Sequence, residues 1–144
     1  MPGADTHVVL DTAAAVTITN PVTLRSLTVG GGAVDVACTS DAALTVTESI
    51  LLLDRGTLTL NKPSAVGNAF YLGEGGLLTH AGNTDSEANK IDLTVGGDMM
   101  IEQGGAIDVR RKGYGKKMGP GAMTINGYAP SYGGKGKNNN ANEG

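Results

Sequence analysis

Large aromatic side chains and cysteine are scarce in this chain of 144 residues, which holds no Trp, one Phe, four Tyr and one Cys. Without large rings, a core must be built from aliphatic side chains. The single cysteine, Cys38, excludes an intrachain disulfide and a CxxC metal site, and its apolar surroundings predict a small buried side chain.

Long apolar runs are also missing. No apolar run exceeds four residues, and the run at residues 50–53 ends at Asp54 and Arg55, far short of the roughly 18 apolar residues that a membrane-spanning helix needs. The first residues lack the basic and apolar regions of a secretory signal. We therefore expect no membrane span, and either a cytosolic protein or a piece excised from a longer secreted one.

Charge and glycine divide the chain into two segments. Residues 1–109 hold 13 acidic and four basic residues, a balance of −9, whereas residues 110–144 hold seven basic residues and one acidic residue, a balance of +6. The second segment carries nine of the 23 glycines, and its only branched aliphatic residue is Ile125. It cannot bury enough apolar surface to fold alone, so it is interpreted as a basic, Gly/Lys/Asn-rich tail.

Short segments of the first part alternate apolar and polar residues with period two, as half-buried strands do. We predict that the apolar members point inward and that the Thr or Asp between them points outward. The predicted inward residues are Leu27, Val29, Val34, Val36, Leu44, Val46, Leu58, Leu60, Leu93, Val95, Ile107 and Val109. The predicted outward residues are Thr28, Asp35, Thr45, Thr59, Thr94 and Asp108.

Repetition favours a coil over hairpins. Leu-Thr-Val-Gly-Gly occurs at 27–31 and at 93–97, and Gly-Ala-Val-Asp-Val at 32–36 returns as Gly-Ala-Ile-Asp-Val at 105–109. The offset of 66 residues between the first pair fits three turns of about 22 residues. We therefore predict an all-β fold, a right-handed parallel β-helix (solenoid) over 1–109 with an extension over 110–144. An antiparallel β-sandwich, with Gly-Gly hairpin turns, is the alternative.

The polar stretch 81–90 predicts a loop that leaves the coil. Within it Asn83, Asp85, Glu87 and Asn89 place oxygen atoms at alternate positions, as calcium sites do, but the glycine turn and terminal Glu of an EF-hand are missing. We interpret it as a solvated loop and predict no cofactor, with calcium as the alternative. His7 and His80 lack further ligands nearby in sequence and are interpreted as structural or surface residues.

A resemblance rests on several phrases. Pro2-Gly3-Ala4-Asp5, Val8-Val9-Leu10-Asp11 and Ser26-Leu27-Thr28-Val29 resemble the first coils of secreted bacterial right-handed β-helix proteins, of the autotransporter-passenger or G8-domain kind. Gly113-Tyr114-Gly115, Gly119-Pro120-Gly121 and Ser131-Tyr132-Gly133-Gly134 look like the Gly-rich loop between coils of such proteins. The resemblance implies secretion or a cell-surface location, further coils beyond Gly144, and no transferable catalytic motif.

Together these features predict a structural or adhesive segment without catalysis. Because a solenoid leaves unpaired strands at its ends and no capping helix is evident, we expect self-association by coil stacking or coverage of the last coil by the tail. The residues expected to contact the acidic coil or an acidic polysaccharide are Arg110, Arg111, Lys112, Tyr114, Lys116, Lys117 and Tyr132.

Other functions are weighed against this one. The alternative is a fragment of a carbohydrate-active β-helix enzyme, similar to a polysaccharide lyase, in which Arg110, Arg111 and Lys112 would supply positive charge for an acidic glycan. Asp35, Glu102 and Asp108 are considered as paired carboxylates for glycoside hydrolysis, but they are interpreted as outward, solvated residues of the coil. Nucleic acid is disfavoured because the acidic body repels phosphate. Ice binding by threonine rows is disfavoured because the outward threonines named above lack a constant spacing.

Overall fold

The computed structural model describes residues 3–115 and 118, and all of the regular secondary structure in these residues is β. Every strand pairing is parallel, which confirms the predicted solenoid and excludes the antiparallel sandwich. The strands are β1 (His7–Leu10), β2 (Ala14–Ile18), β3 (Val22–Val29), β4 (Val36–Ser40), β5 (Leu44–Leu52), β6 (Gly56–Leu60), β7 (Ser64–Val66), β8 (Ala69–Leu72), β9 (Leu77–Thr79), β10 (Leu93–Val95), β11 (Met99–Ile101) and β12 (Ala106–Ile107).

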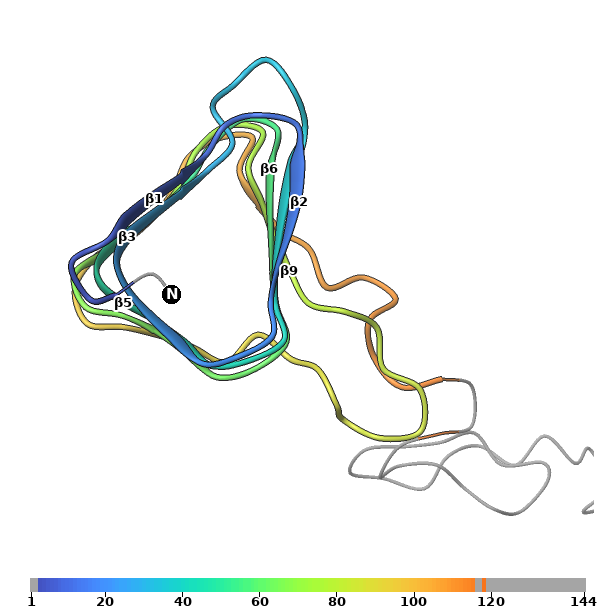
Figure 1. Cartoon of the computed structure of the whole chain (residues 1–144). Coiled ribbons are helices and arrows are strands. Elements are labelled where there is room, and N and C mark those ends of the chain that lie inside the picture. Colours follow the sequence, from blue (N-terminus) through green and yellow to red (C-terminus); the bar gives the residue numbers. More distant parts are fainter. Residues whose placement is uncertain (1–2, 116–117, 119–144) are drawn as a thin grey trace, which may run out of the picture.

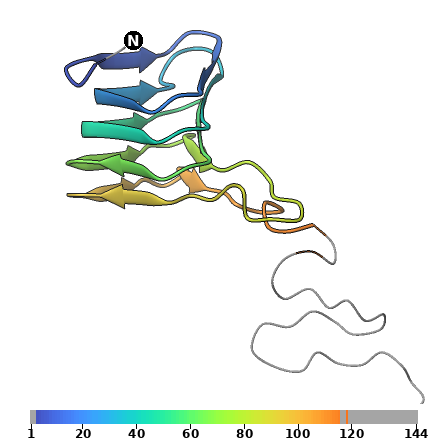
Figure 2. The ribbon, with the colours of Figure 1, turned by 60° about the horizontal axis from the view of Figure 1, so that its bottom comes forward.

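The coil has a triangular cross-section (Figure 1). Side 1 consists of β1, the second halves of β3 and β5, and then β8 and β11. Side 2 is the five-stranded sheet of β2, β4, β6, β9 and β12. Side 3 consists of the first halves of β3 and β5, followed by β7 and β10. Seen from the N-terminal end, the chain runs clockwise as it recedes, so the solenoid is right-handed (Figures 1 and 2).

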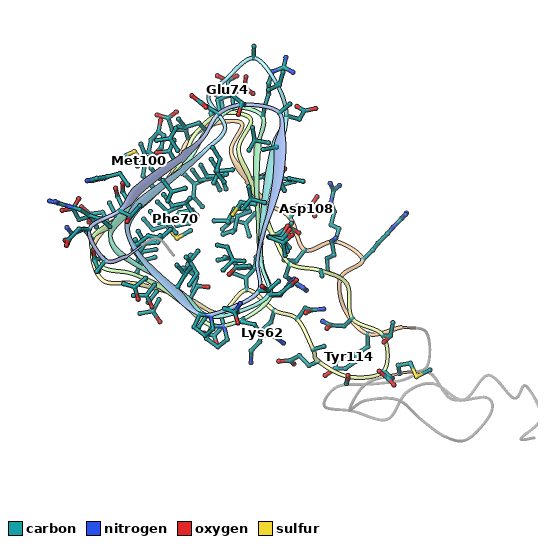
Figure 3. All side chains as sticks on the ribbon, viewed as in Figure 1. Lys62, Phe70, Glu74, Met100, Asp108 and Tyr114 are labelled. Carbon is teal, nitrogen blue, oxygen red and sulfur yellow. The ribbon has the colours of Figure 1, made fainter. Side chains whose placement is uncertain are left out.

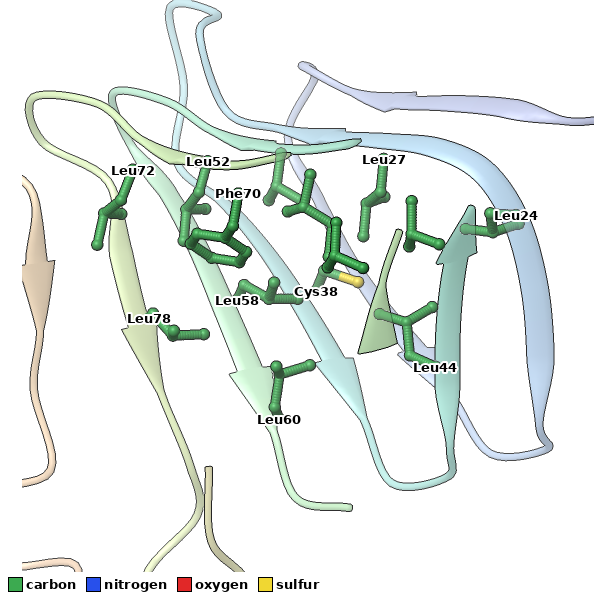
Figure 4. Packing of buried hydrophobic residues seen from close by; sticks show 14 of the residues in the cluster. Leu24, Leu27, Cys38, Leu44, Leu52, Leu58, Leu60, Phe70, Leu72 and Leu78 are labelled. Atoms are coloured by element: carbon green, nitrogen blue, oxygen red, sulfur yellow. The ribbon is translucent and has the colours of Figure 1, made fainter. Parts of the chain in front are cut away.

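The interior is aliphatic, as the scarcity of aromatic residues predicts (Figure 4). Seven of the residues predicted to point inward are at most 2% exposed: Leu27, Val29, Val36, Leu44, Val46, Leu58 and Leu60. Leu93 and Val95 are partly buried against the same cluster. The only Phe of the chain, Phe70, is also fully buried and lies in register with Ile50, a position that the period-two triplets do not mark.

Three predicted inward residues are exposed. Val34 (38%) and Val109 (48%) lie outside the strands, so for them the prediction is wrong. Ile107 occupies an inward position in register with Leu78 but is 44% exposed, because no further described strand covers it. The predicted outward residues are exposed or half-buried, and each strand member among them alternates with inward neighbours.

The repeated phrases are not equivalent in the coil. Leu27 belongs to side 1, whereas Leu93 belongs to side 3, where it continues a register of Val22, Leu44 and Ser64. Val36, the last residue of the phrase at 32–36, pairs with Gly56 at the start of the side 2 sheet. In the phrase at 105–109 the first residue already occupies this register position, so the second phrase enters the sheet four residues earlier in its own sequence than the first. The sequence likeness therefore reflects a shared strand-and-corner pattern and not an offset of whole turns, although the solenoid it predicts is present.

Side 2 carries a threonine row that the sequence spacing does not reveal. Thr17, Thr39, Thr59 and Thr79 are consecutive partners in the sheet register. Each of these follows the one before by a single turn of the coil, whereas the threonines considered from the sequence lie on different sides. Thr79 is 8% exposed and donates a hydrogen bond of 2.6 Å to the carbonyl of Asp108, so the row ends beneath a neighbouring segment.

The corners depend on glycine and on a buried amide. Gly30 has φ +88°, and a Cβ atom there would lie 2.6 Å from the carbonyl oxygen of Asp54. At another corner, Asn61 is 5% exposed. Its Nδ2 donates to Asp41 Oδ1 at 2.6 Å, and its Oδ1 accepts the Ala81 N–H at 2.7 Å. One amide therefore joins three successive levels of the coil.

Candidate functional site: a projection and a polar cluster

The loop predicted at 81–90 does leave the coil, and it does so together with a second segment. Residues 80–92 and 108–115, called the projection here, extend side by side from the corner that follows side 2 (Figure 1). The Asn83 N–H donates to the Lys112 carbonyl at 3.1 Å, and the Gly115 N–H donates to the Thr84 carbonyl at 2.8 Å. The projection is therefore a hydrogen-bonded pair of segments.

Hydrogen bonds also fix the base of the projection to the coil. The Thr79 hydroxyl holds the Asp108 carbonyl, and Asn61 holds the Ala81 N–H, as described above. In addition, the Lys62 ammonium donates to the Ala88 carbonyl at 2.9 Å (Figure 3). With contacts to both of its segments, the projection has a defined direction relative to the solenoid.

Asn83 organises the interior of the projection. Its Oδ1 accepts the N–H groups of Ala88 at 3.0 Å and Asn89 at 2.8 Å, and its Nδ2 donates to the Asn89 carbonyl at 2.7 Å. Glu87 pairs with Lys90 at 3.1 Å. Of the oxygen atoms considered for calcium, those of Asn83, Asp85 and Glu87 thus have partners within the loop. Among the described residues no group of three or more His, Cys, Asp or Glu is placed to hold a metal.

Four of the residues predicted to contact an acidic partner lie in the projection. Arg110 forms an ion pair within the projection. Its guanidinium contacts the Asp108 carboxylate at 2.6 Å and 3.0 Å and lowers the pKa of that carboxyl to about 2. Arg111 is exposed and adopts φ +59°, while Lys112 and Tyr114 are half-buried. Lys116, Lys117 and Tyr132 lie outside the described residues.

The first residues of the tail, 110–115, are attached to the loop at 83–84, whereas the prediction was electrostatic contact with an acidic surface. Backbone hydrogen bonds attach Lys112 and Gly115 to the loop at 83–84, and the ion pair Arg110–Asp108 joins neighbours in sequence. No ion pair links residues 110–115 to the acidic outer surface of the coil. Electrostatic docking of the rest of the tail stays a prediction.

A second group of polar residues, the polar cluster, was not found from the sequence. It contains Asp5, His7, Arg25, Ser26 and Glu48 at the corner between sides 3 and 1. Between Leu24 and Ser26 the register shifts, so that one residue of β3 faces two residues of β5. This irregularity places the Arg25 side chain beside Glu48, which lies 23 residues later.

The contacts within the polar cluster are short. His7 Nδ1 lies 2.6 Å from Ser26 Oγ, and Arg25 Nε donates to Glu48 Oε1 at 2.7 Å. The hydrogen bond from Arg25 lowers the pKa of Glu48, and the charge of His7 acts in the same direction. Glu48, with a smaller effect from Asp5, raises the pKa of Arg25 above its ordinary value. The cluster combines two carboxylates, an imidazole, a guanidinium and a hydroxyl at the surface of one corner.

The carboxylates singled out in the sequence do not join this cluster. Asp35 lies 3.7 Å from Arg55 at another corner, and Asp108 is held by Arg110 in the projection. Glu102 hydrogen-bonds the Tyr71 hydroxyl and thereby raises the pKa of the phenol. Each therefore has a separate partner.

The N-terminal end of the coil opens into an apolar mouth with a cavity of about 230 Å³. Thr19, Asn20 and Pro21 form part of its rim. The apolar residues that line this mouth are Val8, Leu10, Val16, Ile18, Val22, Leu24, Leu27 and Cys38. Val8, Leu10 and Ile18 are only partly buried, as expected for the first level of a solenoid whose interior faces solvent.

No protein-family model, curated protein or solved structure matches this chain. The described residues include no helix long and apolar enough to cross a membrane.

Proposed function

We propose that this chain is a structural, adhesive β-solenoid module of a secreted or cell-surface bacterial protein, and that it presents the projection to an acidic polysaccharide without catalysis of its own. The location follows from the resemblance in sequence. The contact role is supported by one observation, the attachment of the projection to the coil at several points.

Hydrogen bonds at Thr79, Asn61 and Lys62 set the direction of the projection, so its side chains meet a partner with little loss of conformational freedom. Arg111 is exposed there, and no ion pair involves it among the described residues. A guanidinium can bind a carboxylate through two parallel hydrogen bonds, which suits a uronate-containing polymer.

The binding test uses titration of the full chain with polygalacturonate as the probe. Arg111→Asn removes the charge while tolerating the left-handed backbone, and combined with Lys112→Ala we expect binding to weaken about threefold to tenfold. Added salt should weaken binding of the unmodified chain as well. Arg55→Asn, which removes an exposed arginine with the same left-handed backbone (φ +60°) at a different corner, is the matched control and should bind as the unmodified chain does. Equal binding by all three proteins would refute the contact role.

Self-association forms the second part of the proposal, and it involves the apolar mouth. An apolar opening with free strand edges is stabilised when a partner covers it. If two copies meet mouth to mouth, the contact is closed by twofold symmetry and produces a dimer instead of a filament. The mouth supplies the same surface to both partners, as such a contact requires.

Light scattering after size exclusion tests this contact. Ile18→Lys places a charge at the mouth and should give a monomer, whereas Thr17→Lys places the same charge one residue away, on the outer surface, and should leave the dimer intact. If the unmodified chain is a monomer at every concentration, this part of the proposal is wrong.

The polar cluster favours one second candidate, a carbohydrate-active enzyme acting on acidic glycan. In a lyase, a base removes the proton beside a uronate carboxylate while a cation neutralises that carboxylate. His7 and Arg25 are of the right chemical types, although Arg25 already pairs with Glu48. Release of unsaturated sugar products that is lost in His7→Ala would support this candidate, and no release by the unmodified chain would count against it.

A further inference from the structure

A mainly apolar column crosses the outer face of side 1. Its members occupy one outward register position on successive levels, in the order Val9, Thr28, Leu51, Tyr71 and Met100. The two ends of the column are open to solvent, since Val9 is 59% and Met100 57% exposed (Figure 3). An aromatic ring in such a column offers an apolar surface to a partner.

A glycine allows the Tyr71 ring to lie close to the sheet. A Cβ atom at Gly73 would lie 3.0 Å from Tyr71 Cε1 and 3.6 Å from Leu53 Cδ2, so a larger residue at position 73 would displace the ring. At its far end, the Tyr71 hydroxyl donates a hydrogen bond to the Glu102 carboxylate. Tyr71 is therefore a half-buried ring fixed at both ends, and it loses little conformational freedom when a ligand contacts it.

Two adjoining grooves lie beside this ring, at the corner that follows side 1, and they share Glu74 and Gly104. One groove is also lined by Glu102 and Gln103, and the other extends to Asp54. Gly104 has φ +92°, and a Cβ atom there would lie 2.9 Å from Glu74 Cγ. The shared part of the grooves is therefore kept free of an additional side chain.

The grooves are acidic, and two of their carboxylates are not neutralised by the protein. Asp54 has a cation beside it, Arg55 at 3.8 Å, whereas no ion pair among the described residues involves Glu74 or Glu102. Because β8 pairs directly with β11, these two glutamates belong to adjacent levels, about 5 Å apart along the axis. Like charges at this spacing repel each other, so a cationic group beside them would be stabilised.

The combination of ring and carboxylates fits a sugar that carries amino groups. The faces of a pyranose ring present C–H bonds of slight positive charge, which the negative face of an aromatic ring attracts. Ammonium groups form charge-assisted hydrogen bonds with carboxylates and also interact favourably with an aromatic face. The Gln103 amide can exchange hydrogen bonds with sugar hydroxyls. A uronate would instead be repelled by the glutamates.

We propose that Tyr71, Glu74, Glu102 and Gln103 form a binding site for an amino-sugar polymer. The Tyr71 ring would carry one pyranose ring, and the two glutamates would hold its ammonium group. A lysine side chain has the same charge, but it loses more conformational freedom than a rigid sugar ring when it is fixed. The site lies at a different corner from the projection and does not depend on the proposed function.

Calorimetric titration of the full chain with the glucosamine hexamer tests the ligand class, at a mildly acidic pH where amines are protonated and carboxylates ionised. The N-acetylglucosamine hexamer has the same rings without the charges, and hexalysine has the charges without the rings. We expect the glucosamine hexamer to bind at least about fivefold more tightly than either. The proposal is wrong if the glucosamine hexamer does not bind, or if either comparison ligand binds equally tightly.

Paired substitutions test whether binding occurs at these carboxylates. Glu74→Gln with Glu102→Gln removes two charges while keeping the side-chain shapes, and should weaken binding of the glucosamine hexamer about threefold to tenfold. Asp92→Asn with Asp98→Asn is the matched control, because both aspartates are exposed residues of the same level away from the grooves. It should bind as the unmodified chain does. Equal losses in the two double variants would mean that the oligomer senses only the overall charge, which would overturn the proposal.

The contribution of the ring is measured separately. Tyr71→Phe keeps the aromatic face and should bind the glucosamine hexamer within about twofold of the unmodified chain. Tyr71→Leu keeps an apolar side chain in the column but removes the aromatic face, and should weaken binding about threefold to fivefold. Circular dichroism checks that both variants are folded. Equal affinities of the two variants would refute the role of the ring.

Discussion

Leu58 is the residue whose truncation tests the packing of the solenoid most directly. It lies at the middle of β6, is 0% exposed, and is in register with Cys38 on one side and Leu78 on the other (Figure 4). Both neighbours are fixed by the parallel backbone ladders of side 2. The interior therefore has little freedom to close around a missing side chain.

The expected cost of Leu58→Ala follows from this rigidity. Replacing a buried Leu by Ala removes the free energy of burying three carbon atoms and leaves a cavity, with a total of about 2 to 5 kcal/mol. Because the neighbours of Leu58 are held on both sides, we expect a loss of about 3 to 4 kcal/mol in the free energy of unfolding. Thr59→Ala removes an outward side chain one residue later and should cost no more than about 0.5 to 1 kcal/mol.

Urea unfolding followed by circular dichroism measures both variants. A shift of the midpoint with an unchanged slope would report a loss of stability and not a change in the unfolded state. A cost of less than about 1 kcal/mol for Leu58→Ala, or an equal cost for Thr59→Ala and Leu58→Ala, would contradict the assigned packing. Either result would mean that the interior rearranges freely or that the assigned sides are reversed.

Three further predictions concern the corners and the buried thiol. Asn61→Ala leaves two hydrogen-bonding groups without their amide partner and should lower the free energy of unfolding by about 1 to 3 kcal/mol, against little change for the exposed Asn20→Ala. Gly30→Ala should destabilise the fold, measured by the thermal midpoint, because the residue has a positive φ and no room for a Cβ atom, whereas Gly82→Ala should not. Burial raises the pKa of Cys38 from 9.0 to about 11, so the folded state binds a proton more tightly than the unfolded state. Stability should fall as pH rises from about 9 to about 11, and Cys38→Ala should abolish this component.

The alternation of apolar and polar residues predicted the strands well. In Leu44-Thr45-Val46 and in Leu58-Thr59-Leu60, two buried residues flank an outward threonine, as the period of two requires. The same pattern could not establish which strand lies over which, because successive levels differ in length. Repeated phrases therefore suggested a register that the backbone pairing does not have.

The polar cluster required information that no local pattern contains. His7, Ser26 and Glu48 are separated by about one level of the coil each, and the register shift beside Arg25 determines where the arginine points. Without knowledge of this shift, Arg25 and Glu48 are two charges among many. The projection was predictable as a loop from its composition, but composition places its second segment in the tail because basic residues begin at 110.

At the corner that bears the projection, the length of the loop and the pairing of the strands are independent of each other, whereas in most folds the same residues affect both. One level earlier the chain turns directly from Thr59 to Ser64, whereas between Thr79 and Leu93 it makes the whole excursion over 80–92, yet the strands on either side keep their partners. The additional residues are accommodated outside the wall of the coil. This corner is therefore a natural grafting point, where evolution or an engineer can lengthen and diversify a recognition loop while the strand pairing of the scaffold stays the same.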